Sequence, residues 1–162
     1  MRKAEQALGV QTMNDNMARA QTAWHGGCIA CGRLNPMGLR LAFASQDDGS
    51  VEATFPCAQV FEGYDGRVHG GVVATLLDAA MTNCLFARGI AALTGELTIR
   101  FHHSVDIAAP ACVRAWVERS SRPLYLLRAE LIQREEVKAR ASGKFMEARS
   151  ALDESKAGRG AP

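Results

Sequence analysis

The amino-acid sequence predicts an α+β fold in which a sheet wraps around one long, buried helix. Residues 70–87 carry apolar side chains at helical spacing on nearly every face, which is typical of a helix buried on all sides. The segments before and after this helix show the period-two alternation or the short apolar runs of strands. A single helix buried on all sides needs a sheet around it, and no internal repeat or second domain is visible.

The remaining elements follow in chain order. Residues 1–24 are polar and weakly helical in pattern, so we expect an extension that packs as a helix on the body. Residues 25–38 are rich in Gly, Pro and Asn and predict an irregular loop. A strand from Gly38, the hairpin turn Asp47-Asp48-Gly49 and a returning strand are expected next. Strands after the helix are expected over 97–105, 111–119, 124–133 and 137–146.

Composition and charge exclude several classes of function. The net charge is +2, from 19 basic and 17 acidic residues, so no large field attracts nucleic acid or an anionic membrane. No stretch approaches the roughly 20 apolar residues of a membrane span, and residues 1–21 lack the apolar core of a secretory signal. We therefore expect a cytoplasmic protein whose five cysteines are thiols.

Asp78 is the first candidate for chemistry. It is the only formal charge between Arg67 and Arg88, in the middle of the predicted buried helix. A lone carboxylate in apolar surroundings has to be paired, hydrogen-bonded or shifted in pKa. Helical spacing places it on one stripe with Gly71, Thr75 and Thr82, a small and polar seam where a ligand or a partner subunit can approach.

The start of the same helix is the second candidate. His69-Gly70-Gly71 leaves the unpaired N–H groups of the first turn uncovered by side chains. Such a terminus accepts negative charge and stabilises a developing oxyanion. Taken separately, the two glycines also fit a tight turn, and Asp78 also fits a structural carboxylate; the combination in one element favours a site.

At these residues the sequence resembles the hot-dog-fold acyl-CoA thioesterases of the phenylacetate-pathway and 4-hydroxybenzoyl-CoA type. The resemblance covers roughly residues 28–147. The matching motifs are His69-Gly70-Gly71 with Asp78 nine residues after the His, Cys28-x-x-Cys31-Gly32, Asn35-Pro36-x-Gly38-Leu39 and Gly63-Tyr64-x-Gly66.

The resemblance implies a curved antiparallel sheet around the helix. Together with the composition of the two ends, it divides the chain into an N-terminal extension (1–27), a hot-dog domain (28–149) and a flexible tail (150–162). It implies hydrolysis of an acyl-CoA in a homodimer, or a tetramer built as a dimer of dimers, with active sites at the subunit interface. No metal or redox cofactor is implied. By position, Asp78 would be the general base or nucleophile, and the Gly70 N–H would donate to the thioester carbonyl. His69 would shape the site, and Thr94 would hold the attacking water. The implied substrate contacts are Gly71, Glu62, Gly63 and Thr75.

Two positions depart from the family pattern. Relatives commonly carry Glu where Ala79 stands, and an Asn or Gln donor near Glu62. Three other functions stay open: a non-catalytic acyl-CoA sensor, a hot-dog hydratase or dehydratase that uses His69 with Asp78, and a purely structural oligomer. His25, Cys28 and Cys31 have a spacing that suits zinc, but without a second cysteine pair the sequence favours buried thiols in a turn.

Overall fold

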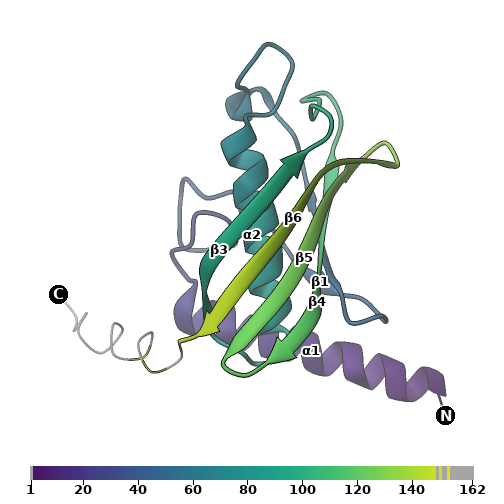
Figure 1. Ribbon diagram of the computed structural model, residues 1–162, viewed down its shortest axis with the longest axis vertical. Coiled ribbons are helices and arrows are strands. Elements are labelled where there is room, and N and C mark those ends of the chain that lie inside the picture. Colours follow the sequence, from purple (N-terminus) through teal and green to yellow (C-terminus); the bar gives the residue numbers. More distant parts are fainter. Residues whose placement is uncertain (1, 149, 151–152, 154–162) are drawn as a thin grey trace.

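The computed structural model describes residues 2–148, 150 and 153. A six-stranded sheet wraps around one central helix, and a second helix lies across the side that the sheet leaves open (Figure 1). The predicted α+β, hot-dog architecture is therefore confirmed. Apart from residues 150 and 153, the expected tail 150–162 lies outside the described residues. The elements are α1 Arg2–Trp24, β1 Ala44–Ser45, β2 Val51–Phe55, the 3-10 turn η1 Gln59–Phe61, α2 Gly70–Phe86, β3 Ala92–Phe101, β4 Ala111–Ser121, β5 Leu124–Gln133 and β6 Glu136–Glu147.

The central helix α2 matches the predicted helix closely. Its last eight residues before Ala87 are all buried, which accounts for the apolar side chains on every face. The side chain of His69 caps its first turn. At the other end, the Arg88 guanidinium donates to the Cys84 carbonyl oxygen at 2.8 Å, and Gly89 adopts a φ of +70°, a left-handed conformation that favours glycine and ends the helix.

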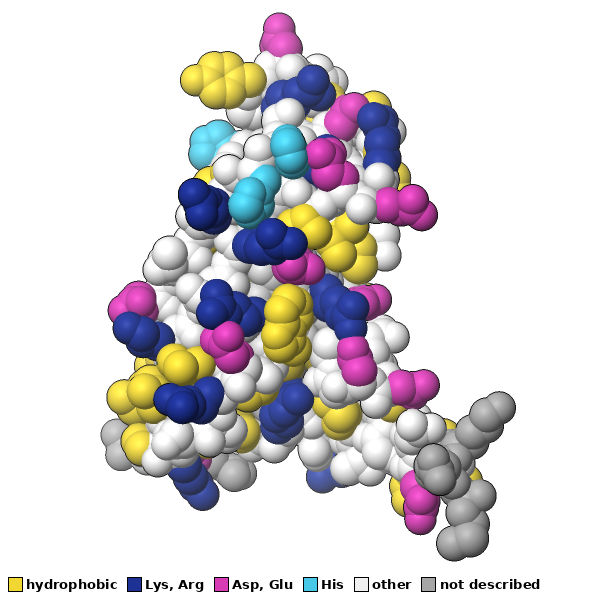
Figure 2. All heavy atoms as spheres, turned by 45° about the vertical axis from the view of Figure 1, so that its right-hand side comes forward, with side chains coloured by type: hydrophobic (Ala, Val, Ile, Leu, Met, Phe, Trp, Pro, Cys, Tyr) yellow, Lys and Arg dark blue, Asp and Glu magenta, His cyan; other side chains and the backbone are white. Residues whose placement is uncertain are grey.

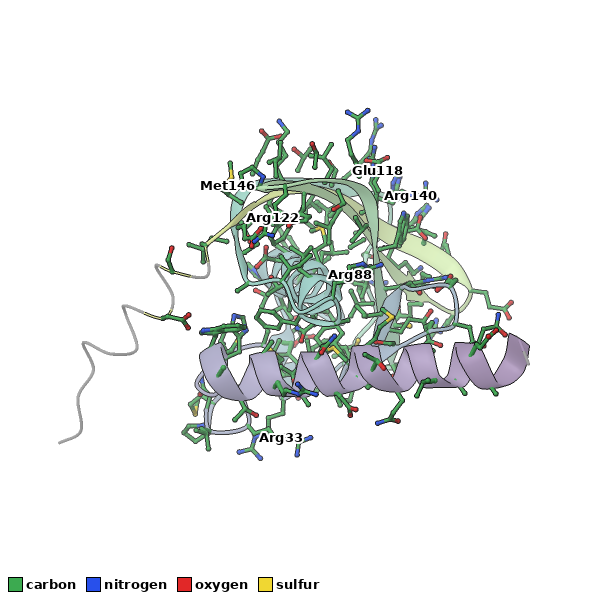
Figure 3. The ribbon with its side chains drawn as sticks, turned by 90° about the horizontal axis from the view of Figure 1, so that it is seen from below. Arg33, Arg88, Glu118, Arg122, Arg140 and Met146 are labelled. Atoms are coloured by element: carbon green, nitrogen blue, oxygen red, sulfur yellow. The ribbon has the colours of Figure 1, made fainter. Side chains whose placement is uncertain are left out.

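All strand pairs are antiparallel, in the order β1-β2-β4-β5-β6-β3. The sheet arches over α2, and α1 runs across the opposite side of α2 (Figure 3). Met17 and Ala20 of α1 are buried in the common core. A polar contact fixes the two helices, since Gln21 Nε2 donates to Oδ1 of the fully buried Asn83 at 2.6 Å. The N-terminal extension thus packs as a helix, as expected.

Two strand predictions were wrong in their extent. Residues 38–43 do not join the sheet: Arg40 has a φ of +53°, and the N–H groups of Leu39 and Leu41 donate to the carbonyls of the 28–31 loop. Only Ala44–Ser45 remains as β1. Strand β3 begins at Ala92 and ends at Phe101, so the expected strand over 97–105 starts earlier and stops before its two histidines.

The charged side chains are interspersed on the surface. Figure 2 shows basic and acidic groups side by side on one face. Several form ion pairs between neighbouring strands, among them Arg128 with Glu118 and Lys144 with Glu96. This mixture of charges agrees with the sequence, whose nearly balanced acidic and basic residues predict no large electrostatic field of one sign. No helix among the described residues is both long enough and apolar enough to cross a membrane.

Candidate active site

Asp78 lies half-buried in the middle of α2 and is hydrogen-bonded to the neighbouring strand. The Thr94 hydroxyl donates to Asp78 Oδ1 at 2.7 Å. Thr94 belongs to β3, where the pairing with β6 is interrupted between Thr94 and Glu96. The structure therefore brings together two residues that the sequence analysis placed in one site, although sixteen positions separate them along the chain.

The surroundings of Asp78 favour its protonated form more than water does. Burial raises the pKa of the Asp78 carboxyl because the charged form loses hydration, and the hydrogen bond from Thr94 lowers it in partial opposition. Negative charge at Cys28 raises the same pKa, and His25 lowers it. A half-buried carboxylate with a raised pKa is a stronger base than an exposed one, which suits proton abstraction.

The start of α2 offers one free donor. The Gly71 N–H donates to His69 Nδ1 at 2.9 Å, so the side chain that caps the helix already occupies this group. The Gly70 N–H has no hydrogen-bond acceptor among the described residues. Of the two N–H groups that the sequence suggested, the Gly70 group is therefore the one available to a ligand.

The loop before α2 holds His69 in place. The His69 N–H donates to the Phe61 carbonyl oxygen at 2.8 Å. A Cβ on Gly63 would lie 3.1 Å from the His69 ring and 3.2 Å from its Cα, so a glycine lets the loop approach this closely. Gly63 thus shapes the site through His69.

Two expected substrate contacts are engaged within their own segments. The Glu62 carboxylate accepts a hydrogen bond from the Gly66 N–H and closes the loop before the helix. The Thr75 hydroxyl donates to the Gly71 carbonyl oxygen at 2.9 Å, one turn earlier. The Glu62 carboxylate has a structural partner in this loop, at a place where the family pattern has a neutral donor.

A groove of about 240 Å³ opens at the start of α2. It is lined by Gly70, Val73 and the segment from Phe101 to Val105. The Phe101 ring lies 3.7 Å from the position that a Cβ on Gly70 would take. The sequence pattern does not mark Phe101 as a site residue, because its place beside the helix start depends on the packing of β3.

The free donor and the carboxylate lie far apart within one chain. Gly70 and Asp78 are eight positions apart on α2, which is about 12 Å along the axis. A reacting carbonyl oxygen has to lie about 3 Å from its donor, and the carbonyl carbon roughly 3–3.5 Å from the attacking atom. When the Asp78 carboxylate is itself the attacking atom, one carbonyl does not meet both conditions on one helix.

Arginine side chains suit the phosphate groups of CoA, and five candidates divide into engaged and free ones. Arg122 forms a two-bond pair with Glu147 at 2.7 and 2.6 Å, and Arg128 pairs with Glu118. Every ion pair of the described residues involves cations other than Arg33, Arg40 and Arg100. These three side chains are therefore available to an anion.

Comparisons with known proteins agree with the hot-dog fold. The family model described as the thioesterase superfamily matches residues 65–139, a segment that contains the helix start, Asp78 and Thr94. This segment is similar to the thioesterase superfamily, and the fold around it is the hot-dog fold. The resemblance stated from the sequence motifs is thereby confirmed.

Solved structures of similar shape include the PaaI protein of the Escherichia coli phenylacetic acid degradation operon, with a TM-score of 0.72, 18% identity, and coverage of 86% of this chain and 95% of that one. A thioesterase superfamily protein matches with a TM-score of 0.71 and 23% identity over 77% of this chain and 64% of that one. A Streptococcus mutans protein bound to acetyl CoA matches with a TM-score of 0.62 and 19% identity, covering 67% and 88%. At these identities the likeness concerns the fold.

A curated relative is the acyl-coenzyme A thioesterase THEM4 of Bos taurus. It is 27% identical over 85 residues, which is 52% of this chain and 35% of the relative. The chain thus spans about a third of the length of the curated relative that it matches. This similarity supports a thioesterase and leaves the acyl group open.

Proposed function

We propose that this protein hydrolyses an acyl-CoA thioester to a free acid and CoA, with Asp78 as the catalytic carboxylate. The observation that carries the proposal is the contact of Asp78 with Thr94 in the half-buried middle of α2. The thioesterase-superfamily match spans this pair. The name of the bovine relative and the acetyl CoA bound to the streptococcal protein support an acyl-CoA as substrate.

Asp78 either takes a proton from water or attacks the thioester carbon itself. In both routes the ionised form reacts, and the Thr94 hydroxyl holds the carboxylate, or the water beside it, in one position. The Gly70 N–H, at the positive end of the α2 dipole, polarises the carbonyl and stabilises the developing oxyanion. One donor of this kind contributes about 3 kcal/mol to the transition state.

The active site is complete only between two copies of the chain. The separation of about 12 Å along the helix axis between Gly70 and Asp78 supports an arrangement in which the donor of one subunit serves the carboxylate of another. The edge strand β3 is the surface for this contact, because its outer edge has no neighbouring strand among the described residues. The large apolar side chains of Leu93 and Phe101 on β3 are 51% and 54% exposed, and Met146 beside Leu93 is 48% exposed.

A homodimer, or a tetramer of two such dimers, places these apolar side chains in an interface. Sedimentation velocity tests this part separately. The wild type is expected to sediment as a dimer or larger, and a Leu93→Glu, Met146→Glu double variant as a smaller species with little hydrolysis. A wild type that is monomeric at micromolar concentration and fully active would contradict the two-subunit site.

Hydrolysis of a panel of acyl-CoAs tests the activity. Release is followed by the thioester absorbance, so that the five protein thiols do not contribute. Asp78→Asn is expected to lose about a hundredfold or more in kcat, the loss typical of a missing base or nucleophile. Asp47→Asn, which removes an exposed carboxylate from the hairpin turn, is the matched control and keeps full activity.

A different outcome points to a different function. If wild type and Asp78→Asn bind acyl-CoA equally and neither turns over any member of the panel, the protein is a binding or sensing module. Retained activity in Asp78→Asn would remove this carboxylate from the mechanism.

A further inference from the structure

The turn that follows α1 has a shape set by its last glycine. Cys28 and Cys31 lie on this turn, and the Gly32 N–H donates to the Cys28 carbonyl oxygen at 3.0 Å. A Cβ on Gly32 would lie 2.4 Å from the Cys28 nitrogen and 2.6 Å from its carbonyl oxygen, distances that no side chain tolerates. A glycine is therefore required for the chain to fold back so tightly that the two thiols face the same side.

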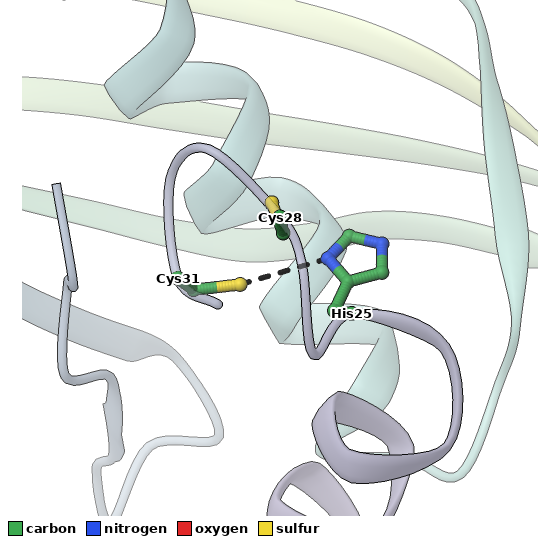
Figure 4. Close-up of side chains that lie close together, drawn as sticks. All are labelled: His25, Cys28 and Cys31. Carbon is green, nitrogen blue, oxygen red and sulfur yellow. Dashed lines mark hydrogen bonds between the residues drawn. The ribbon is translucent and has the colours of Figure 1, made fainter. Parts of the chain in front are cut away.

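His25 completes a cluster of three potential ligand atoms. Its ring nitrogen and the two cysteine sulfurs all lie within 4.8 Å of one another (Figure 4). The distance from Cys31 Sγ to His25 Nδ1 is 3.6 Å. In a tetrahedral zinc site with bonds of roughly 2.3 Å to sulfur and 2.0 Å to nitrogen, the sulfur and the nitrogen lie about 3.5 Å apart.

The surroundings hold this cluster in place. The Ala30 N–H points at Cys28 Sγ at 3.4 Å, an arrangement that stabilises a thiolate, which is the form that binds a metal. The His25 ring packs edge-on against Phe86, with centroids 4.8 Å apart and planes at 88°. Without a metal, a hydrogen bond between Cys31 and His25 accounts for the short distance between these two side chains. It does not account for the N–H donor that is directed at Cys28.

An ion can reach the cluster from outside. A cavity of about 430 Å³ is lined by His25, Cys31, Gln21 and Arg33, among others. The described residues supply no fourth His, Cys, Asp or Glu to the group, so the fourth position of a tetrahedral ion falls to water or to a small molecule in this cavity. Three protein ligands with one open position is a common arrangement for zinc.

We propose that His25, Cys28 and Cys31 form a binding site for a single divalent transition-metal ion of the zinc type. The ion would join the end of α1 to the turn that follows it. The three ligands are not part of the proposed catalytic group, and metal binding does not depend on hydrolysis, although charge at Cys28 and His25 acts on the pKa of Asp78. The sequence favoured simple buried thiols because a second cysteine pair is missing. Sequence spacing does not show that the His25 ring lies beside the two thiols.

Metal binding to the full-length protein tests the proposal. The protein is reduced, stripped with a chelator, and titrated with Co²⁺ alone and then with Zn²⁺ in competition. We expect one equivalent of Co²⁺ to produce thiolate-to-cobalt charge-transfer absorption and tetrahedral d–d bands, which Zn²⁺ abolishes. Because loss of an outer contact to a metal ligand already costs about 10–100-fold in affinity, Cys28→Ser, Cys31→Ser and His25→Ala should each lose more than about a hundredfold.

Two further thiols provide the controls. Cys57 and Cys112 are half-buried outside the cluster, so Cys57→Ser and Cys112→Ser should bind Co²⁺ as the wild type does. Far-ultraviolet circular dichroism identifies variants that fold normally, and these decide the result. The proposal is overturned if the reduced wild type binds no Co²⁺ or Zn²⁺ at micromolar concentration, if folded Cys28→Ser binds as tightly as the wild type, or if the two cysteines form a disulfide and the re-reduced protein takes up no metal.

Discussion

Replacing Thr94 by valine removes the hydroxyl that donates to Asp78 and keeps a side chain of similar shape. The lost contact is a 2.7 Å hydrogen bond to a carboxylate. Hydrogen bonds to charged groups contribute roughly 1.5–3 kcal/mol. Because Thr94 is exposed, water replaces part of the contact, and the lower end of that range applies. About 1.5 kcal/mol of lost positioning corresponds to roughly a tenfold fall in kcat/KM.

The pH profile of Thr94→Val gives a second, independent measurement. The hydrogen bond lowers the pKa of Asp78, so its removal moves the acid limb of kcat/KM to higher pH. Thr94→Ser keeps the hydroxyl and is the matched control, with a nearly wild-type rate and acid limb. The reasoning fails if Thr94→Val leaves both rate and acid limb unchanged, or if serine and valine reduce the rate equally.

Three further predictions follow from single contacts. A Cβ on Gly143 would lie 2.6 Å from the Phe145 ring and 3.1 Å from the sulfur of Met81 on α2. Gly143→Ala should therefore lower the free energy of unfolding by about 1–3 kcal/mol, and an unchanged urea midpoint would contradict this packing. Gly70→Ala meets only ordinary contact with Phe101 at 3.7 Å, so it should fold normally yet lose hydrolysis, because a methyl group obstructs the approach to the N–H; an active variant argues against the donor. Burial raises the pKa of Asp78 above its value in the unfolded chain. The contribution of the Asp78 carboxyl to folding stability is therefore complete below the unfolded pKa and is lost as the pH rises through the folded pKa. Asp78→Asn should therefore have a higher urea midpoint than wild type at pH 8, with the difference shrinking in acid; equal midpoints at both pH values would refute it.

The sequence indicated much of the candidate site because one helix carries most of it. His69, Gly70 and Asp78 belong to a single regular segment whose spacing fixes their separation, so the pattern predicted both the helix and its two candidate groups. Thr94 came from resemblance alone, and its contact with Asp78 requires β3 to lie beside α2. The partners of Glu62 and Gly71 were also missed, since capping and loop closure depend on side-chain directions that spacing does not give.

For this protein the sequence alone determined the order of the elements, the buried helix and the lone charge within it. These are properties of local periodicity, which the pattern of apolar side chains records directly. The tertiary structure decided that residues 38–43 pair with the cysteine turn instead of the sheet, and that β3 lies at an edge with exposed apolar side chains. It also decided that His25 meets Cys28 and Cys31. The reason is physical: these arrangements arise from packing between segments distant along the chain, and local pattern carries no record of which distant segments meet.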